Sequence, residues 1–221
     1  FNFLSFDYAT IIPFECWIEY DYVDILLVTT ITPIAISMMI YLACQIEVSC
    51  YTRDAGQKHE RTIRTQYYQY FLYLTYLVLP SVTTVIFGMF PCQNVDGQEE
   101  DQYYLRNDLS ISCSSERYTT GVTIAALMIL VYPFGIPALY FWQLFLHRDL
   151  IRYRTDENSG GRTAEVATKY GFLYESYEPR FWYWESVEAI RRIVLTGAVS
   201  VLSPSSSTHS VAGMILALGY I

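Results

Sequence analysis

Long stretches without charge are the feature that most constrains this sequence. Residues 25–46, 65–95, 118–147 and 193–221 contain no Asp, Glu, Lys or Arg. A helix of about 20 apolar residues is long enough to cross a hydrocarbon core of roughly 30 Å. Buried helices of a water-soluble protein are the alternative, but four such stretches rarely occur together outside membranes. We therefore expect an all-α, polytopic helical membrane protein.

The boundaries of the spans follow from the flanking charges and from one polar interruption. Residues 203–210, Ser-Pro-Ser-Ser-Ser-Thr-His-Ser, divide the last stretch in two. Prolines inside the spans are tolerated in membranes, because neighbouring groups satisfy the freed carbonyls, so we expect kinks rather than breaks. The sequence begins with Phe and ends in an apolar run, and we expect it to be an internal piece of a longer protein. We predict one membrane domain over residues 1–221, with at least four complete transmembrane helices and a truncated fifth, at about 25–46, 68–90, 118–146, 187–202 and 211–221.

The distribution of charge predicts the orientation of these helices. Of the 14 Lys and Arg residues, 12 lie in or next to the segments 47–66 and 148–186. Cytoplasmic loops of membrane proteins are enriched in Lys and Arg. The opposite side holds only two Arg residues but eleven acids, which account for most of the net charge of −8. We therefore predict that residues 1–24 and 91–117 are extracellular or lumenal, and that 47–66 and 148–186 are cytoplasmic.

The cysteines agree with this orientation. Cys92 and Cys113 flank the predicted outer loop, where oxidising conditions permit a disulfide bond. We predict a Cys92–Cys113 bridge, with Cys16 unpaired or bonded to something outside this chain. The alternative is a pair of free thiols near the membrane surface. Cys44 and Cys50 lie at the cytoplasmic end of the first span and are expected to be reduced.

An aromatic segment precedes the fourth predicted span. Residues 177–194 read YEPRFWYWESVEAIRRIV, in which Pro179 favours a helix start and the aromatic cluster suits the lipid headgroup layer. We interpret the segment as an interfacial elbow helix that leads into the fourth span and could transmit motion from cytoplasmic loops to the bundle. The alternative is an aromatic anchor with exposed ion pairs. The candidate coupling residues are Glu185, Glu188, Arg191 and Arg192, since Glu188 can reach both arginines at helical spacing.

The predicted outer loop is acidic, and its carboxylates could attract cations to an entrance. Their spacing does not match an EF-hand, and a solvated acidic face is the alternative interpretation. The candidate cation-attracting residues are Asp96, Glu99, Glu100, Asp101 and Asp108.

Signatures of catalysis are missing from the sequence. It contains no Walker A loop, no HExxH and no G-x-S-x-G, and its three histidines are scattered. We therefore expect no enzyme activity, no cofactor and no bound metal. The expected partners are the lipid bilayer, other transmembrane helices, and either further copies of the chain or a larger membrane assembly, with no nucleic acid.

Several motifs resemble one known group of proteins. They are FNFLSFDYATIIPFECW at the start, LVLPSVTTVIFGMFPC in the second span, VYPFGIP in the third and YEPRFWYWESVEAIRRIVLTG entering the fourth. With them the chain resembles the TRP-like C-terminal membrane region of large cysteine-rich surface proteins of algae, diatoms and oomycetes. That group has two outer-loop cysteines around a D-G…YLR-D…I-C pattern, and the resemblance therefore adds support to the disulfide. The pattern is matched here by Cys92, Asp96, Gly97, Tyr104, Leu105, Arg106, Asp108 and Cys113.

Two functions remain open on these grounds. The resemblance implies a cation channel or a sensor module that regulates cation flux. The alternative is a non-conducting anchor or accessory structural subunit, favoured by the absence of charge within the first three spans. Hydroxyl side chains could line a pore, although they also serve helix packing. They are Thr29, Thr30, Thr32, Ser37, Thr75, Ser81, Thr83 and Thr84.

Overall fold

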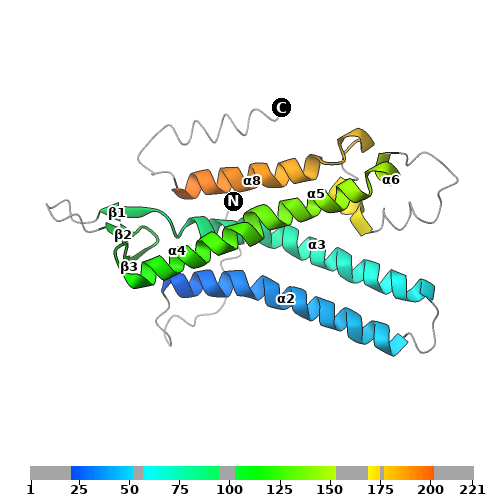
Figure 1. Cartoon of the computed structure of the whole chain (residues 1–221), viewed down its shortest axis with the longest axis horizontal. Coiled ribbons are helices and arrows are strands. Elements are labelled where there is room, and N and C mark those ends of the chain that lie inside the picture. The colour runs from blue at the N-terminus through cyan, green and yellow to red at the C-terminus, as the bar shows by residue number, and fades with distance from the viewer. Residues whose placement is uncertain (1–20, 52–56, 95–102, 153–168, 175–176, 202–221) are drawn as a thin grey trace. The chain divides into compact units, whose positions relative to one another are not determined.

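Helices dominate the computed structural model, which describes residues 21–51, 57–94, 103–152, 169–174 and 177–201 (Figure 1). Of these residues 81% are helical, in agreement with the helical fold class predicted from the sequence. The remainder includes a three-stranded sheet, which the all-α prediction did not anticipate.

Three helical segments are long and apolar enough to cross a membrane. Helix α2 (Tyr22–Tyr51) and helix α3 (Gln57–Phe87) coincide with the first two predicted spans, and both begin before the predicted start. The third span consists of α4 (Glu116–Ile129), the π-helical segment η2 (Leu130–Gly135) and α5 (Ile136–Leu146). The first three predicted spans are therefore helices of sufficient length, at Tyr22–Cys50, Glu60–Phe87 and Glu116–Leu146.

Prolines lie inside all three segments without ending them. Helices α2 and α3 continue through Pro33 and Pro80, as expected for helices in a membrane. In the third segment, Pro133 cannot donate to the carbonyl of residue 129, and Pro137 cannot donate to the carbonyl of Pro133. A π-helix pairs each carbonyl with the N–H five residues later, so the carbonyl of residue 129 can bind the N–H of Phe134 in place of the donor that is missing at Pro133. This explains why the chain widens into η2 at this point.

The fourth predicted span is only partly matched. Helix α8 (Trp184–Val201) has 18 residues and follows a short 3₁₀ helix, η4 (Pro179–Phe181), so the elbow and the predicted span 187–202 are largely one helix. Because charged residues occupy the first half of α8, it is not among the segments long and apolar enough to cross a membrane. The prediction of at least four complete spans is therefore not confirmed. The predicted fifth span, 211–221, lies outside the described residues.

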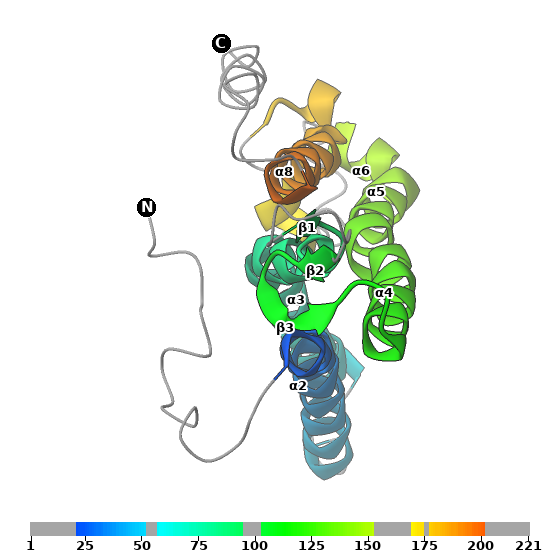
Figure 2. The same cartoon turned by 90° about the vertical axis from the view of Figure 1, so that its left-hand side faces the viewer.

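The predicted outer loop contains a small antiparallel sheet in the order β1-β2-β3. Strands β1 (Cys92–Asn94), β2 (Tyr103–Leu105) and β3 (Asp108–Ser112) have three to five residues each, too few for alternation of polar and apolar residues to reveal them. In Figures 1 and 2 the sheet lies beside the first turns of α2 and α4.

The chain forms two compact units. We call residues 1–31, 79–133 and 192–221 the sheet unit, and residues 32–78 and 134–191 the elbow unit. Helix α6 (Arg148–Arg152) and the helical residues 169–174 belong to the elbow unit. The core of the sheet unit includes Val23, Leu26, Val82, Ile86, Met89 and Leu105, and that of the elbow unit includes Leu72, Tyr140, Leu144, Ile151 and Leu173.

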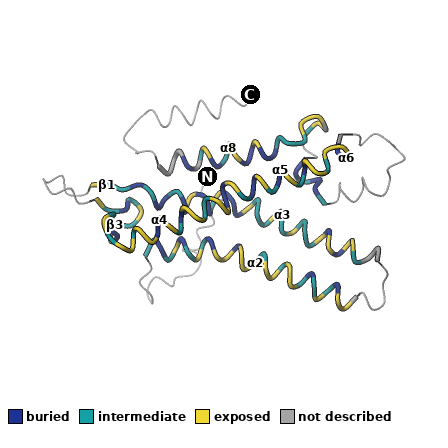
Figure 3. The backbone as a smooth tube through the Cα atoms, viewed as in Figure 1, coloured by how far each residue is buried: buried dark blue, intermediate teal, exposed yellow. Residues whose placement is uncertain are grey.

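Large apolar side chains remain exposed along the helices (Figure 3). Soluble monomers rarely expose contiguous apolar surfaces of this kind, whereas lipid is a suitable solvent for them. The exposed residues of α2 alone include Val28, Ile31, Ile34, Met38, Met39, Leu42 and Ile46.

Candidate functional site

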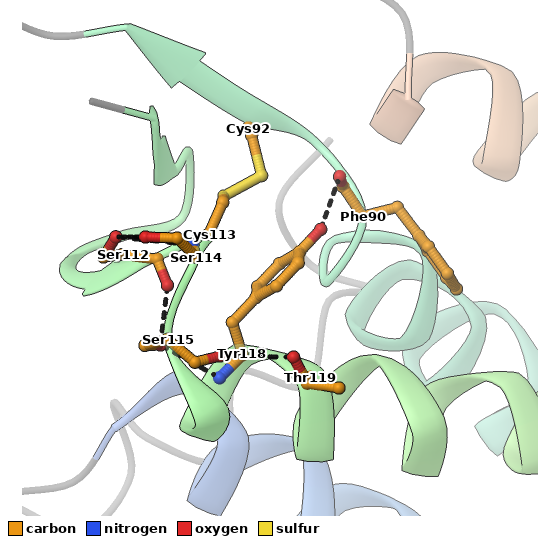
Figure 4. The surroundings of a disulfide bond; sticks show 8 residues. All are labelled: Phe90, Cys92, Ser112, Cys113, Ser114, Ser115, Tyr118 and Thr119. Carbon is orange, nitrogen blue, oxygen red and sulfur yellow. Dashed lines mark hydrogen bonds between the residues drawn. A yellow bond between two sulfur atoms is a disulfide. The ribbon is translucent and has the colours of Figure 1, made fainter. Parts of the chain in front are cut away.

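The sheet unit contains the predicted disulfide. Cys92 in β1 is bonded to Cys113, just after β3, with the two Cα atoms 6.5 Å apart (Figure 4). The Cys113 N–H donates to the Tyr103 carbonyl at 2.8 Å, which aligns the bridge with the sheet. The prediction of this pair from the sequence is confirmed, and the alternative of two free thiols does not hold.

The disulfide lies next to the start of α4. The Ser115 hydroxyl accepts a hydrogen bond from the Tyr118 N–H at 3.2 Å and donates to the Ser112 carbonyl at 2.6 Å, so it caps the helix. The Tyr118 hydroxyl donates to the Phe90 carbonyl at 3.4 Å (Figure 4). These bonds connect the beginning of α4 with the residues that follow α3.

Asp108 has a structural partner at the start of α2. Its carboxylate accepts from the Tyr22 N–H at 2.9 Å and from the N–H and hydroxyl of Ser110 at 3.0 and 2.6 Å. Burial raises the pKa of Asp108, but the hydrogen bonds from Ser110 and Tyr22 outweigh this effect and hold the pKa below its usual range. Asp108 therefore caps α2, where a negative charge suits the helix dipole. The other predicted cation-attracting residues, Asp96, Glu99, Glu100 and Asp101, lie outside the described residues.

Sequence reasoning missed a second contact between the loop and the helices. The Asn107 amide donates to the Gly88 carbonyl at 2.9 Å and to the Tyr22 hydroxyl at 3.2 Å, while that hydroxyl donates to the Val85 carbonyl at 3.0 Å. A Cβ atom on Gly88 would collide with the Tyr22 hydroxyl and the Asn107 amide. Only a glycine at position 88 lets the end of α3 lie this close to the Tyr22 hydroxyl and the Asn107 amide. No local spacing in the sequence indicates a contact between residues this far apart.

Arg117 joins the first turns of α2 and α4. Its guanidinium lies 2.7 Å from an Asp24 oxygen and 3.2 Å from an Asp21 oxygen. The three side chains are partly exposed, so these ion pairs contribute little to the free energy of folding. They contribute more to determining which helix ends lie next to each other. Arg117 is one of two cations on the predicted outer side, and it pairs with two of the acids there.

The elbow unit holds two buried carboxylates on α8. Glu185 is 6% exposed and accepts from the Tyr177 hydroxyl at 3.0 Å. Glu188 is 7% exposed and accepts two hydrogen bonds from the Arg191 guanidinium, one of them at 2.8 Å from Nε. The predicted Glu188–Arg191 contact is present, and the burial of Glu188 does not fit the alternative of exposed ion pairs. Arg192 lies in the next position of α8 and is partly exposed.

Further polar side chains of the elbow unit are paired between segments. The Thr75 and Tyr140 hydroxyls lie 2.9 Å apart and join α3 to α5. The Tyr170 hydroxyl donates to the Gln143 side-chain carbonyl at 3.0 Å. These groups form what we call the elbow cluster: Thr75, Tyr140, Gln143, Tyr170, Tyr177, Glu185, Glu188 and Arg191.

Aromatic side chains pack next to the elbow. The Trp182 ring lies 5.6 Å from the Phe141 ring and 6.2 Å from the Phe145 ring, measured between centroids. The Arg148 guanidinium lies 4.3 Å from the centroid of Phe145. This arrangement of aromatic rings and a cation suits a headgroup layer, as the sequence predicted for the elbow.

Five of the eight hydroxyls predicted as a possible pore lining donate to carbonyls of their own helices: Thr30, Ser37, Thr75, Thr83 and Thr84. Thr30 and Thr83 are fully buried, and each donates to the carbonyl four residues earlier, at 2.8 and 2.6 Å. Such bonds serve packing inside a helix bundle. Among the described residues, no three His, Cys, Asp or Glu side chains come close enough together to hold a metal ion.

Comparison with known proteins gives a distant relative. The chain is 29% identical over 138 residues to "Cysteine repeat modular protein A" of Toxoplasma gondii. The match covers 60% of this chain but only 4% of that protein, so the chain spans a small part of its relative's length. No protein-family model matches the sequence. No solved structure matches it either.

Proposed function

We propose that this chain is a TRP-like, multi-pass membrane module of a larger cysteine-rich surface protein, and that it acts as a cation channel or as a sensor that regulates cation flux. The burial of Glu185 and Glu188 is the observation that carries this proposal. A helix that only anchors a protein needs an apolar surface and gains nothing from buried carboxylates. Ionisable groups at membrane depth are costly and typically serve function.

The elbow cluster supplies a means of coupling. Its hydrogen bonds join α3 to α5, α5 to the helical residues 169–174, and Tyr177 to α8, and each bond breaks if the two segments that it joins separate. A buried carboxylate that loses its hydrogen-bond partners costs several kcal/mol. The carboxylates of Glu185 and Glu188 therefore have few alternative positions. A signal that moves the predicted cytoplasmic loops is therefore passed on to the spans as a change of packing.

The orientation belongs to the same proposal. We place residues 1–24 and 91–117 outside the cell or in a lumen, because the disulfide requires oxidising conditions and most Lys and Arg residues lie in the other loops. In this arrangement α8 begins in the headgroup layer and enters the membrane as the fourth span.

Cation flux into liposomes containing the full-length protein tests the proposal. We expect Glu185→Gln and Glu188→Gln each to change the flux about 5- to 150-fold, the range of typical coupling free energies. Glu60→Gln is the matched control, since Glu60 also pairs with an arginine, Arg64, but on the first turn of α3 and partly exposed. Equal flux in all four proteins would reject a role for the elbow cluster.

A non-conducting anchor is the second candidate. The buried hydroxyls of Thr30 and Thr83, which bond to their own helices, favour it, as does the small share of the relative that this chain covers. An anchor predicts flux no greater than that of empty liposomes. It also predicts that replacing the chain by an unrelated membrane anchor leaves the larger protein at the surface and functional.

A further inference from the structure

Within the sheet unit, the three long helical segments are not attached to one another in the same way. Helices α3 and α4 are connected by the Cys92–Cys113 disulfide, which lies between the end of one and the start of the other. The cysteines of α2, Cys44 and Cys50, are free. Among the described residues, the first turn of α2 is therefore held to the sheet, to α3 and to α4 by noncovalent contacts.

The polar contacts of this turn converge on Tyr22, the first residue of α2. Its N–H donates to the Asp108 carboxylate at 2.9 Å, its hydroxyl accepts from the Asn107 amide at 3.2 Å, and the same hydroxyl donates to the Val85 carbonyl at 3.0 Å. Asn107 lies between β2 and β3, and Asp108 begins β3. The absence of a side chain at Gly88 leaves room for the Tyr22 hydroxyl and the Asn107 amide. The turn between β2 and β3 and the end of α3 together bind one tyrosine side chain.

The remaining contacts hold this end of α2 less firmly. The ion pairs of Arg117 with the start of α2 are partly exposed, and such pairs contribute little to stability. Val23 and Leu26 are fully buried. In a bilayer, however, lipid chains are as apolar as the neighbouring helices, so burial of these two side chains gives little preference for the bound position. The hydrogen bonds of Tyr22 therefore decide whether this end of α2 stays in place.

We propose that the turn between β2 and β3 is a releasable dock for α2: the first turn of α2 separates from the sheet while α3 and α4 stay joined by the disulfide. Native proteins open locally in this way where few contacts hold an element. Asn94 pairs with Tyr103, and β2 leads from Tyr103 to Asn107, so movement of the loop between β1 and β2 is passed to α2. The dock does not depend on whether the protein conducts ions, because it follows from contacts inside the sheet unit.

Thiol modification at a buried position measures the release in the full-length protein in lipid nanodiscs, with Cys16, Cys44 and Cys50 replaced by serine. Val23→Cys is the reporter, because Val23 is fully buried and lies between two acids, where water has access once α2 is released. Ile111→Cys, at a buried position in β3, is the reference for opening of the sheet itself. A buried thiol reacts with a water-soluble maleimide in proportion to the time for which it is exposed, so rare openings are also measured.

Two variants weaken the dock. Tyr22→Phe removes both hydrogen bonds of the hydroxyl and should raise the reaction rate of Val23→Cys about 5- to 30-fold. Asn107→Ala removes one of these bonds and should raise the rate about fivefold. In the Tyr22→Phe background, Asn107→Ala should add little, because Asn107 acts on α2 through that hydroxyl. The rate at Ile111→Cys should stay the same in all these variants.

Tyr118→Phe is the matched control, because it removes a tyrosine hydroxyl bond from the first turn of α4 instead of α2. We expect it to leave the rate at Val23→Cys unchanged. An unchanged rate in Tyr22→Phe, or the same rise in Tyr118→Phe, would overturn the dock. An equal rise at Ile111→Cys would do so as well, since the sheet unit would then open as a whole. A full effect of Asn107→Ala in the Tyr22→Phe background would reject the path through Asn107.

Discussion

At the residue scale, the polar side chains just described bind specific partners within the chain rather than solvent. Asp108 caps α2, Asn107 bridges Gly88 and Tyr22, and Glu188 binds Arg191. Only the last of these contacts could be predicted from the sequence, because only it joins residues three positions apart in one helix. The contacts of Asp108 and Asn107 with Tyr22 span more than eighty residues of sequence, and the composition of a loop does not reveal which helix end it will meet.

Asp108 gives a pH-dependent contribution to stability. Its pKa in the folded protein is lowered from 3.8, so the contribution is complete above that value and is lost as the pH falls through the lower, folded pKa. We expect Asp108→Ala to cost about 1 kcal/mol near pH 7, as for other helix caps, and less below pH 3.8. Thermal unfolding in detergent at both pH values measures the difference. Asp149→Ala, at an exposed position on α6, is the control, and a difference independent of pH would contradict the assignment.

At the element scale, charge-free length was sufficient to predict three helices but not what interrupts or joins them. The spans around Pro33 and Pro80 follow from composition, whereas the widening of the helix into η2 around Pro133 does not. The sheet was missed because its strands have only three to five residues each. Helix α8 begins at Trp184, between the helix start expected at Pro179 and the predicted start of the fourth span at 187, and its charges shorten the apolar part.

The disulfide should stabilise the sheet unit measurably. The bridge closes a loop with a sequence separation of 21, for which chain entropy gives about 3 kcal/mol. We expect the double variant Cys92→Ser, Cys113→Ser to unfold at lower temperature and its outer loop to be cleaved faster by protease. Cys50→Ser is the control, since Cys50 is a free and exposed cysteine. Equal cleavage rates in the two variants would mean that the hydrogen bonds alone hold the loop.

At the scale of the whole molecule, the proposal is that the chain crosses the membrane several times with its sheet on the outer side. The separation of charge is its main support, since 12 of 14 Lys and Arg residues lie in or beside the two segments predicted to be cytoplasmic. The match to the relative from Toxoplasma gondii covers only 4% of that protein.

Labelling with a membrane-impermeant maleimide tests this topology in cells. Cys50 is exposed near the end of α2 and should react only after the membrane is permeabilised. Cys16 and Cys44 are replaced by serine in both proteins, and Leu109→Cys, at an exposed position in β3, should then react in intact cells when Cys50 is also serine. The opposite pattern would reverse the predicted orientation, and reaction of both in intact cells would exclude the crossing of α2.

The position of the disulfide has a mechanical consequence. Cys92 lies five residues after the end of α3, and Cys113 lies three residues before the start of α4. The disulfide between them therefore connects the two helices covalently by a route that leaves out the loop. A pull applied to that loop is delivered to both helix ends together and cannot draw them apart. Insertions between Asn94 and Tyr103 can therefore lengthen or remodel the outer surface while the spacing of the two helices stays the same.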